Sequence, residues 1–148
     1  MYKSSDLGVA TVEILSGNII HLVAKKGVVI TLEDAQRLVR AIDGMLDKSN
    51  NIRAGIFEIS GVVYVEEDAR NYFEKGEDTT GDTVGIALVS DSFLGRTVGN
   101  MFVTMHPNTK FPVKFFDTAM RAEHWIRGLI SNYNRLKNTQ SNAEKRVA

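Results

Sequence analysis

The sequence contains no cysteine, and this absence excludes several kinds of chemistry. A chain without thiols forms no disulfide, holds no thiolate-ligated metal and carries no cysteine nucleophile or CxxC redox pair. No stretch reaches the ~20 apolar residues that a membrane-spanning helix needs. The beginning of the chain, MYKSSDLGVATVEIL, alternates and carries charge, unlike the apolar core of a signal peptide. We therefore expect a bacterial-type cytoplasmic protein without a transmembrane segment.

An excess of one charge is also missing, because 18 basic side chains face 18 acidic ones. No overall field exists to hold nucleic acid or an anionic membrane, and basic residues are not interleaved with aromatic ones as nucleic-acid binding requires. The charge is uneven locally. Eight acidic side chains stand against two basic ones between Glu58 and Asp82, and four basic side chains stand against one acidic one from Ser131 onward.

The length and composition are those of one folded domain. The chain has 148 residues, of which 43% are hydrophobic and 24% charged, close to the averages for soluble globular proteins. A domain of this length buries roughly 68–70% of the surface that its unfolded chain exposes. One hydrophobic core is therefore expected, with no internal repeat.

Hydrophobic periodicity predicts an order of β-β-α-β-α-β-α-β-α. The runs 9–15 and 19–24, separated by a Ser-Gly-Asn reversal, predict an antiparallel hairpin near a sheet edge. Later apolar runs predict buried strands, and steps of three and four predict helices, the first capped by Thr31 with Asp34 at its third position. The later strands are expected at 54–59, 83–90 and 113–116, and the helices at 32–47, 66–73, 92–106 and 118–133, with 62–65 in a loop.

This order predicts an α/β fold in a single domain. Strands that alternate with helices imply crossover connections, so the sheet of about five strands should be largely parallel after its antiparallel hairpin. About four helices should cover it. The polar segment 134–148 is expected to be a disordered tail that frays from the last helix.

The motifs of metal sites and common enzymes are absent. The three histidines, His21, His106 and His124, are isolated from other ligands, and neither an HExxH pattern nor an EF-hand loop occurs, so we expect no metal site. No GxSxG elbow and no Walker loop is present. We therefore expect no cofactor and no enzymatic activity.

Two passages resemble a known family. The string ALVSDSFLGRTVGNMF, followed after a loop by FPVKFF and the helix of Trp125, resembles the SpoIIAA-like branch of the STAS-type domains, especially small bacterial members of unassigned function. IFEISGV and GVVITLEDAQRLV agree with the same pattern, so the resemblance covers roughly residues 8–130. It implies a STAS-like domain over residues 1–133 with a mixed five-strand sheet. The most specific part of the resemblance is the motif from Asp91 to Asn100, which contains a polar cluster of Asp91, Ser92, Arg96 and Asn100.

The resemblance also implies a role in protein-protein regulation. In the anti-sigma factor antagonists of that family, a serine at the helix start after the third strand is phosphorylated, which ends partner binding. Here the corresponding segment, residues 65–69, reads VEEDA and lacks that serine, so the phosphorylation switch is not carried over. We expect an interaction module that docks a partner with a basic surface. The expected contact residues are Val62, Val63, Tyr64, Glu66, Glu67, Asp68 and Arg70.

An alternative function stays open from the sequence. The STAS-like sheet resembles that of the CRAL-TRIO lipid-transfer domains, and adaptable Met and Phe side chains could line a pocket for a small apolar ligand. Core packing explains the same residues more simply. They are Phe93, Met101, Phe102 and Met105, with Phe111, Phe115 and Phe116 nearby in sequence. Because glycine notches such as Gly95 and Gly99 allow helices to pair, a homodimer is also among the expectations.

Overall fold

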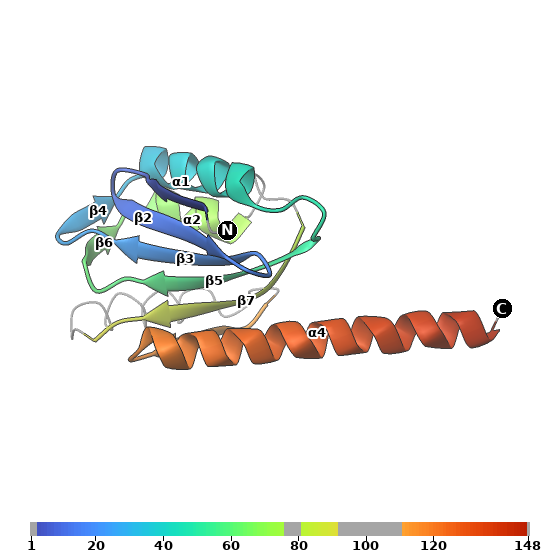
Figure 1. Ribbon diagram of the computed structural model, residues 1–148. Coiled ribbons are helices and arrows are strands. Elements are labelled where there is room, and N and C mark those ends of the chain that lie inside the picture. The colour runs from blue at the N-terminus through green and yellow to red at the C-terminus, as the bar shows by residue number, and fades with distance from the viewer. Residues whose placement is uncertain (1–2, 76–80, 92–110, 148) are drawn as a thin grey trace.

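The computed structural model describes residues 3–75, 81–91 and 111–147. In these parts of the chain six strands form one sheet in the order β1-β2-β3-β5-β7-β8, and two short strands, β4 and β6, form a separate pair (Figure 1). The strands are β1 (Lys3–Asp6), β2 (Ala10–Leu15), β3 (Ile19–Ala24), β4 (Val28–Ile30), β5 (Ile52–Glu58), β6 (Val62–Val65), β7 (Asp82–Val89) and β8 (Val113–Phe116). The helices are α1 (Leu32–Met45), α2 (Glu67–Lys75) and α4 (Ala119–Val147).

The pairing of the strands confirms the predicted mixed α/β sheet. β1 and β3 both pair antiparallel with β2, whereas β3 with β5, β5 with β7, and β7 with β8 pair parallel. The five strands expected from the sequence are thus β2, β3, β5, β7 and β8. Three of the four expected helices are present, and the helix expected at 92–106 lies outside the described residues.

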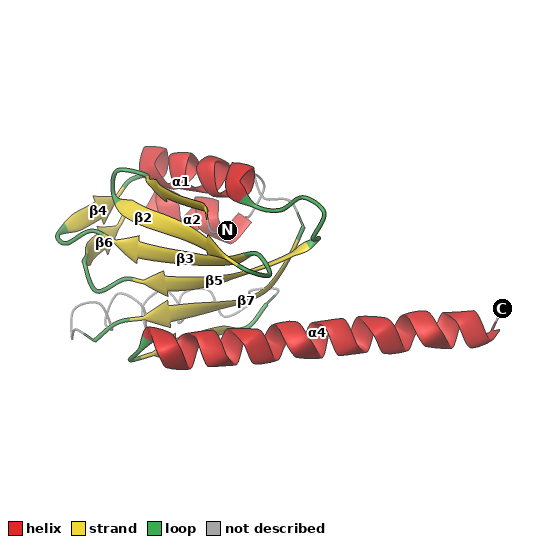
Figure 2. Cartoon of the chain, in the orientation of Figure 1, coloured by secondary structure: helices red, strands yellow, loops and turns green. Residues whose placement is uncertain are grey.

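The two faces of the sheet are covered by different helices (Figure 2). Because successive side chains of a strand point to opposite faces, Ile19 and Ile20 belong to different cores. Ile19 packs with Ile126 of α4, while Ile20 packs with Ile42 of α1. A third cluster joins α1 and α2 to the small sheet; its buried members are Ile30, Ala35, Val62 and Ala69.

Helix α1 begins where its capping residues predict. The hydroxyl of Thr31 accepts a hydrogen bond from the amide of Asp34 at 3.1 Å, and the Asp34 carboxylate accepts one from the amide of Thr31 at 3.1 Å. This capping box satisfies two donors that the first turn of a helix leaves free. The apolar side of α1 then packs on β2 and β3.

Three strands differ from the sequence expectation. β1 and β4 lie in segments where no strand was expected, and the segment 62–65, expected as a loop, is strand β6. All four residues of β1 are exposed, so its polar KSSD sequence carries no apolar signal. Each of these strands is defined by pairing with another segment, which the hydrophobic pattern of the strand itself does not encode.

The end of the chain also differs from the expectation. Residues 134–147 continue α4 as a helix, where a disordered tail was expected. In Figure 1 this part of α4 projects beyond the sheet.

Candidate functional site

An exposed apolar patch lies on the small sheet of β4 and β6. Val29, Val63 and Tyr64 are 43%, 46% and 47% exposed, and we call these three side chains the apolar patch. Val29 and Tyr64 are partners in the parallel register. A register shift between Val28 and Val29 gives β6 one extra residue, Val63, which also faces solvent. The patch is therefore built by the bulge and not by alternation alone.

The backbone holds the two strands of the small sheet together at both ends. At the start of the strands, the amides of Gly27 and Val28 donate to the carbonyl oxygen of Gly61 at 2.8 and 3.1 Å. At the other end, the amide of Glu66 donates to the carbonyl oxygen of Ile30 at 2.9 Å. Val62, which the sequence analysis placed among the contact residues, is 4% exposed and packs in the core below.

Arg70 of α2 fixes the position of Tyr64. Its guanidinium carbon lies 5.6 Å from the centre of the Tyr64 ring, within the range of a cation–π contact. The same guanidinium donates to the carbonyl oxygen of Val65 at 3.1 Å. The aromatic ring is thus held against the start of α2.

Three acidic side chains border the apolar patch where α2 begins. Glu66 is partly buried, Glu67 and Asp68 are exposed, and we call these three the acidic rim. Within the described parts of the chain, none of them forms an ion pair. Their negative charge is favourable at the positive end of the α2 dipole, so the helix start tolerates it without a cationic partner. The structure thus brings together the expected contact residues Tyr64, Glu66, Glu67, Asp68 and Arg70, with Val29 added to them.

The polar cluster expected from the resemblance is described only at Asp91. The Asp91 carboxylate accepts a hydrogen bond from the hydroxyl of Ser60 at 3.0 Å, and that hydroxyl lies 3.3 Å from the hydroxyl of Ser90. These groups follow the carboxyl ends of β5 and β7. Ser92, Arg96 and Asn100 lie outside the described residues.

A histidine–carboxylate pair on the α4 side of the sheet was not found from the sequence. Nε2 of His21 on β3 lies 2.5 Å from Oε2 of Glu58 on β5, and both side chains are partly buried. Glu58 is the register partner of Val23, two residues beyond His21, so the two side chains share a face. The pairing of these two residues, which are far apart in sequence, could be predicted only from the parallel register of β3 and β5.

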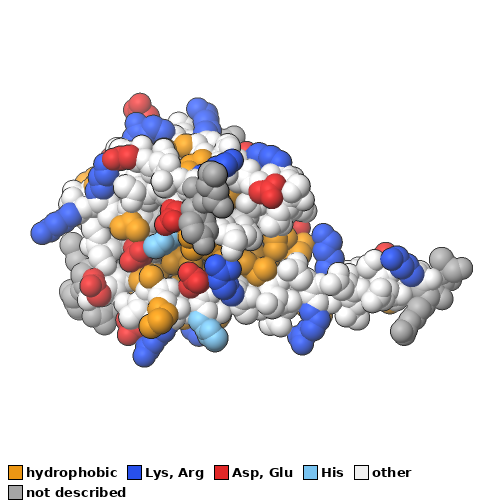
Figure 3. Space-filling model, viewed as in Figure 1, with side chains coloured by type: hydrophobic (Ala, Val, Ile, Leu, Met, Phe, Trp, Pro, Cys, Tyr) orange, Lys and Arg blue, Asp and Glu red, His pale blue; other side chains and the backbone are white. Residues whose placement is uncertain are grey.

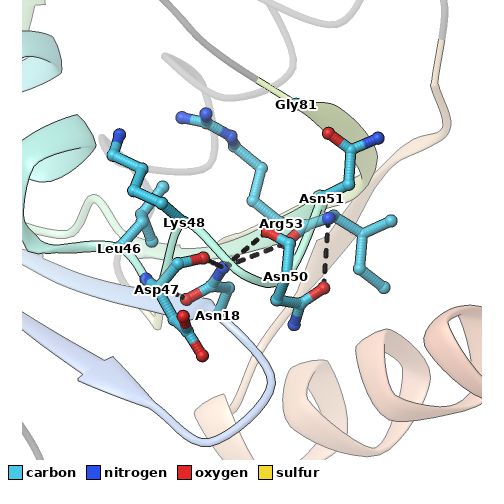
Figure 4. A pocket seen from close by; sticks show the side chains of 9 residues that line it. Asn18, Leu46, Asp47, Lys48, Asn50, Asn51, Arg53 and Gly81 are labelled. Carbon is cyan, nitrogen blue, oxygen red and sulfur yellow. Dashed lines mark hydrogen bonds between the residues drawn. The ribbon is translucent and has the colours of Figure 1, made fainter.

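A polar hollow of about 240 Å³ lies at the amino end of β5 (Figure 4). Nδ2 of Asn18 donates to the carbonyl oxygen of Asp47 at 2.9 Å, and Oδ1 of Asn18 accepts from the amide of Asp47 at 2.9 Å. Hydrogen bonds from the hydroxyl and amide of Ser49 lower the pKa of the Asp47 carboxyl. The buried Arg53 pairs with Asp43 at 3.1 Å. These polar groups connect the β2–β3 turn to the loop before β5 through hydrogen bonds.

The described residues offer no group of three or more histidine, aspartate or glutamate side chains that could hold a metal ion. In the same parts of the chain, no helix is both long and apolar enough to cross a membrane. Of the side chains on which the apolar-ligand alternative depends, Phe116 packs against Trp125 in the core, with ring centres 5.4 Å apart. Phe93, Met101, Phe102 and Met105 lie outside the described residues, so this alternative stays a prediction.

Comparison with solved structures supports the fold assignment. The chain is similar to an uncharacterized protein from the DUF3478 family with a SpoIIAA-like fold from Shewanella loihica PV-4. The two share 13% sequence identity at a TM-score of 0.51, over 85% of this chain and 95% of that one. This likeness confirms the SpoIIAA-like α/β fold expected from the sequence and extends no further than the fold. No curated protein matches the chain. A family model does match, over residues 13–130, and the chain therefore belongs to the family described as Domain of unknown function (DUF7793).

Proposed function

We propose that this protein is a non-enzymatic interaction module that binds a partner protein through the apolar patch and the acidic rim. The observation that carries the proposal is the adjacency of these two surfaces: exposed Val63 and Tyr64 lie in β6, directly before the acidic start of α2, and exposed Val29 is the register partner of Tyr64. A partner that fits would present an apolar side chain flanked by basic ones.

The patch has the physical properties of a binding centre. Tyrosine and arginine are enriched among the residues that dominate interface energies, and here Arg70 already holds the Tyr64 ring in place. A side chain ordered before binding loses less entropy when the partner arrives. The two-stranded sheet beneath it is held together at both ends by backbone hydrogen bonds.

The acidic rim would determine which partners bind. Charges at the border of an interface accelerate encounter with oppositely charged partners and exclude partners of like charge. Because residues 66–68 are acidic where the anti-sigma factor antagonists carry a phosphorylatable serine, the negative charge of the rim does not depend on phosphorylation. Binding through this surface would then be regulated by salt and by the partner's charge and not by phosphorylation at the helix start.

A charge reversal tests the proposal. Purified wild type and the variant Glu67→Lys/Asp68→Lys are used to capture partners from cells that express the protein naturally. The matched control is Asp117→Lys/Glu123→Lys, which makes the same change in net charge near the start of α4, on the opposite face of the sheet, and breaks two exposed ion pairs worth roughly 0.3–0.5 kcal/mol each.

We expect the partner to be recovered with wild type and with the control, and to be lost with the reversed rim. Loss of capture at raised salt should parallel the effect of the reversal. Recovery of the same partners by all three proteins would overturn the proposal.

A further inference from the structure

The final turns of α4 have no packing partner among the residues that the structure describes. Residues 134–145 are exposed on every side of the helix, and the last described contact with the body is the hydrogen bond from the Tyr133 hydroxyl to Asp82 at 3.1 Å. Residues 134–147, which we call the projecting helix, extend about 21 Å at a rise of 1.5 Å per residue.

Part of the projecting helix has low intrinsic helix propensity. Asn, Ser and Thr favour turns and caps over helix interiors. This segment includes five such residues, namely Asn134, Asn138, Thr139, Ser141 and Asn142. Helices of this kind normally gain their stability by packing a face against another surface. A packing partner outside the chain would supply that stability.

The chemistry of the projecting helix complements the candidate site. Leu136 is 66% exposed, and its sequence neighbours are Arg135 and Lys137. The segment from Ser131 onward carries four basic side chains against one acidic one. The basic side chains of this end are visible in Figure 3. An exposed apolar side chain between cations is the type of ligand that the proposed site requires.

The projecting helix does not reach the candidate site of its own chain. In Figure 1, β4 and β6 lie at one end of the sheet, and the C-terminal end of α4 projects beyond the other end. A continuous helix from Ala119 to Val147 does not turn back. Contact between the two surfaces therefore requires two molecules.

We propose that the projecting helix of one copy binds the apolar patch and acidic rim of a second copy, and that two copies do so reciprocally. Leu136 packs on the apolar patch, while Arg135 and Lys137, on either side of Leu136 around the helix, bring positive charge near Glu67 and Asp68. A reciprocal exchange makes a closed pair with a two-fold axis, in which both copies use the same surfaces. This inference rests on the proposed function, since it takes the same surface and names its partner.

Complementary charge reversals test the inference by sedimentation velocity at several protein concentrations. One variant is Glu67→Lys/Asp68→Lys and the other is Arg135→Glu/Lys137→Glu. Each variant alone places like charges at both contacts, whereas a mixture of the two restores opposite charges at both. We expect wild type to dimerise, each variant alone to dimerise about tenfold or more weakly, and the mixture to form a heterodimer. The control Arg121→Glu/Arg127→Glu reverses two cations in the packed half of the same helix, and it should dimerise like wild type.

Wild type that stays monomeric at the highest concentration would overturn the inference, as would variants that each dimerise like wild type. Far-UV circular dichroism of each variant shows that the domain remains folded. The two proposals fail separately. A different partner whose capture depends on Glu67 and Asp68, together with monomeric wild type, would retain the proposed function and reject the second copy as its partner.

Discussion

Removal of the Asn18 side chain should lower the free energy of unfolding by a large amount for a small polar residue. Asn18 occupies a left-handed backbone conformation at φ 58°, and only 5% of it is exposed. Its amide group forms one donor and one acceptor bond with the backbone of Asp47, both at 2.9 Å, and approaches the carbonyl oxygens of Asn50 and Ile52 at 3.3 Å. One side chain thus ties the β2–β3 turn to the loop between α1 and β5.

The substitution Asn18→Gly removes these bonds while it keeps a residue that adopts positive φ freely. Each neutral hydrogen bond contributes about 1 kcal/mol net, and a buried group left unpaired costs about 1–3 kcal/mol. The polar hollow beside Asn18 admits water to some of these groups, which reduces the cost. We expect a loss of about 2–3 kcal/mol of unfolding free energy, or about 5–10 °C in Tm for a chain of this length.

The variant Asn18→Ala separates the two contributions. It loses the same bonds and adds the strain of an alanine at positive φ, so it should be less stable than the glycine variant by about 1 kcal/mol or more. Urea unfolding followed by the fluorescence of the single tryptophan, Trp125, which packs in the α4 core, measures both losses. A glycine variant within about 0.5 kcal/mol of wild type would refute the reasoning, because surface changes alone have effects of that size.

Two further predictions concern packing and titration. A methyl group on Gly61 would lie 2.3 Å from the carbonyl oxygen of Lys25, so Gly61→Ala should lower the unfolding free energy by about 1–3 kcal/mol. Gly128 in α4 has open space around it, so Gly128→Ala should raise the unfolding free energy by about 0.5–1 kcal/mol in the same urea experiment. Burial, together with the Asp82 carboxylate, raises the pKa of the Tyr133 phenol above its usual value near 10. Its contribution to stability is therefore present below the pKa of the unfolded chain and is lost as pH rises through the folded pKa. In an absorbance titration of tyrosine ionisation, Tyr133→Phe should remove one tyrosine that ionises above the usual pH range, and a profile unchanged at high pH would contradict the assignment.

The sequence predicted the elements whose signals are local. Two β-rich runs separated by a Ser-Gly-Asn reversal identified the β2–β3 hairpin, and the capping residues Thr31 and Asp34 identified the start of α1. Both signals act between residues close in sequence, so they do not depend on the rest of the fold. The order of strands and helices then constrained the sheet to be mixed, because parallel strands require crossovers.

The strands that the sequence missed are those defined by their pairing partner. β1 has an entirely polar sequence and exists through its register with β2. β4 and β6 are three and four residues long and pair with each other in an irregular register. The same irregularity exposes Val63 while Val62 is buried. The expectation of a loop at 62–65 did not predict which of these side chains would be exposed.

The sequence alone determined the acidic helix start and the basic end of the chain, because these are properties of composition along a short segment. Only the tertiary structure decided that Val29 lies beside Tyr64, that Arg70 holds the Tyr64 ring and that His21 meets Glu58. It also decided that α4 continues beyond the sheet to Val147. The physical reason is that these features depend on strand register and on which surfaces the helices cover, and both are set by contacts between segments far apart in the chain.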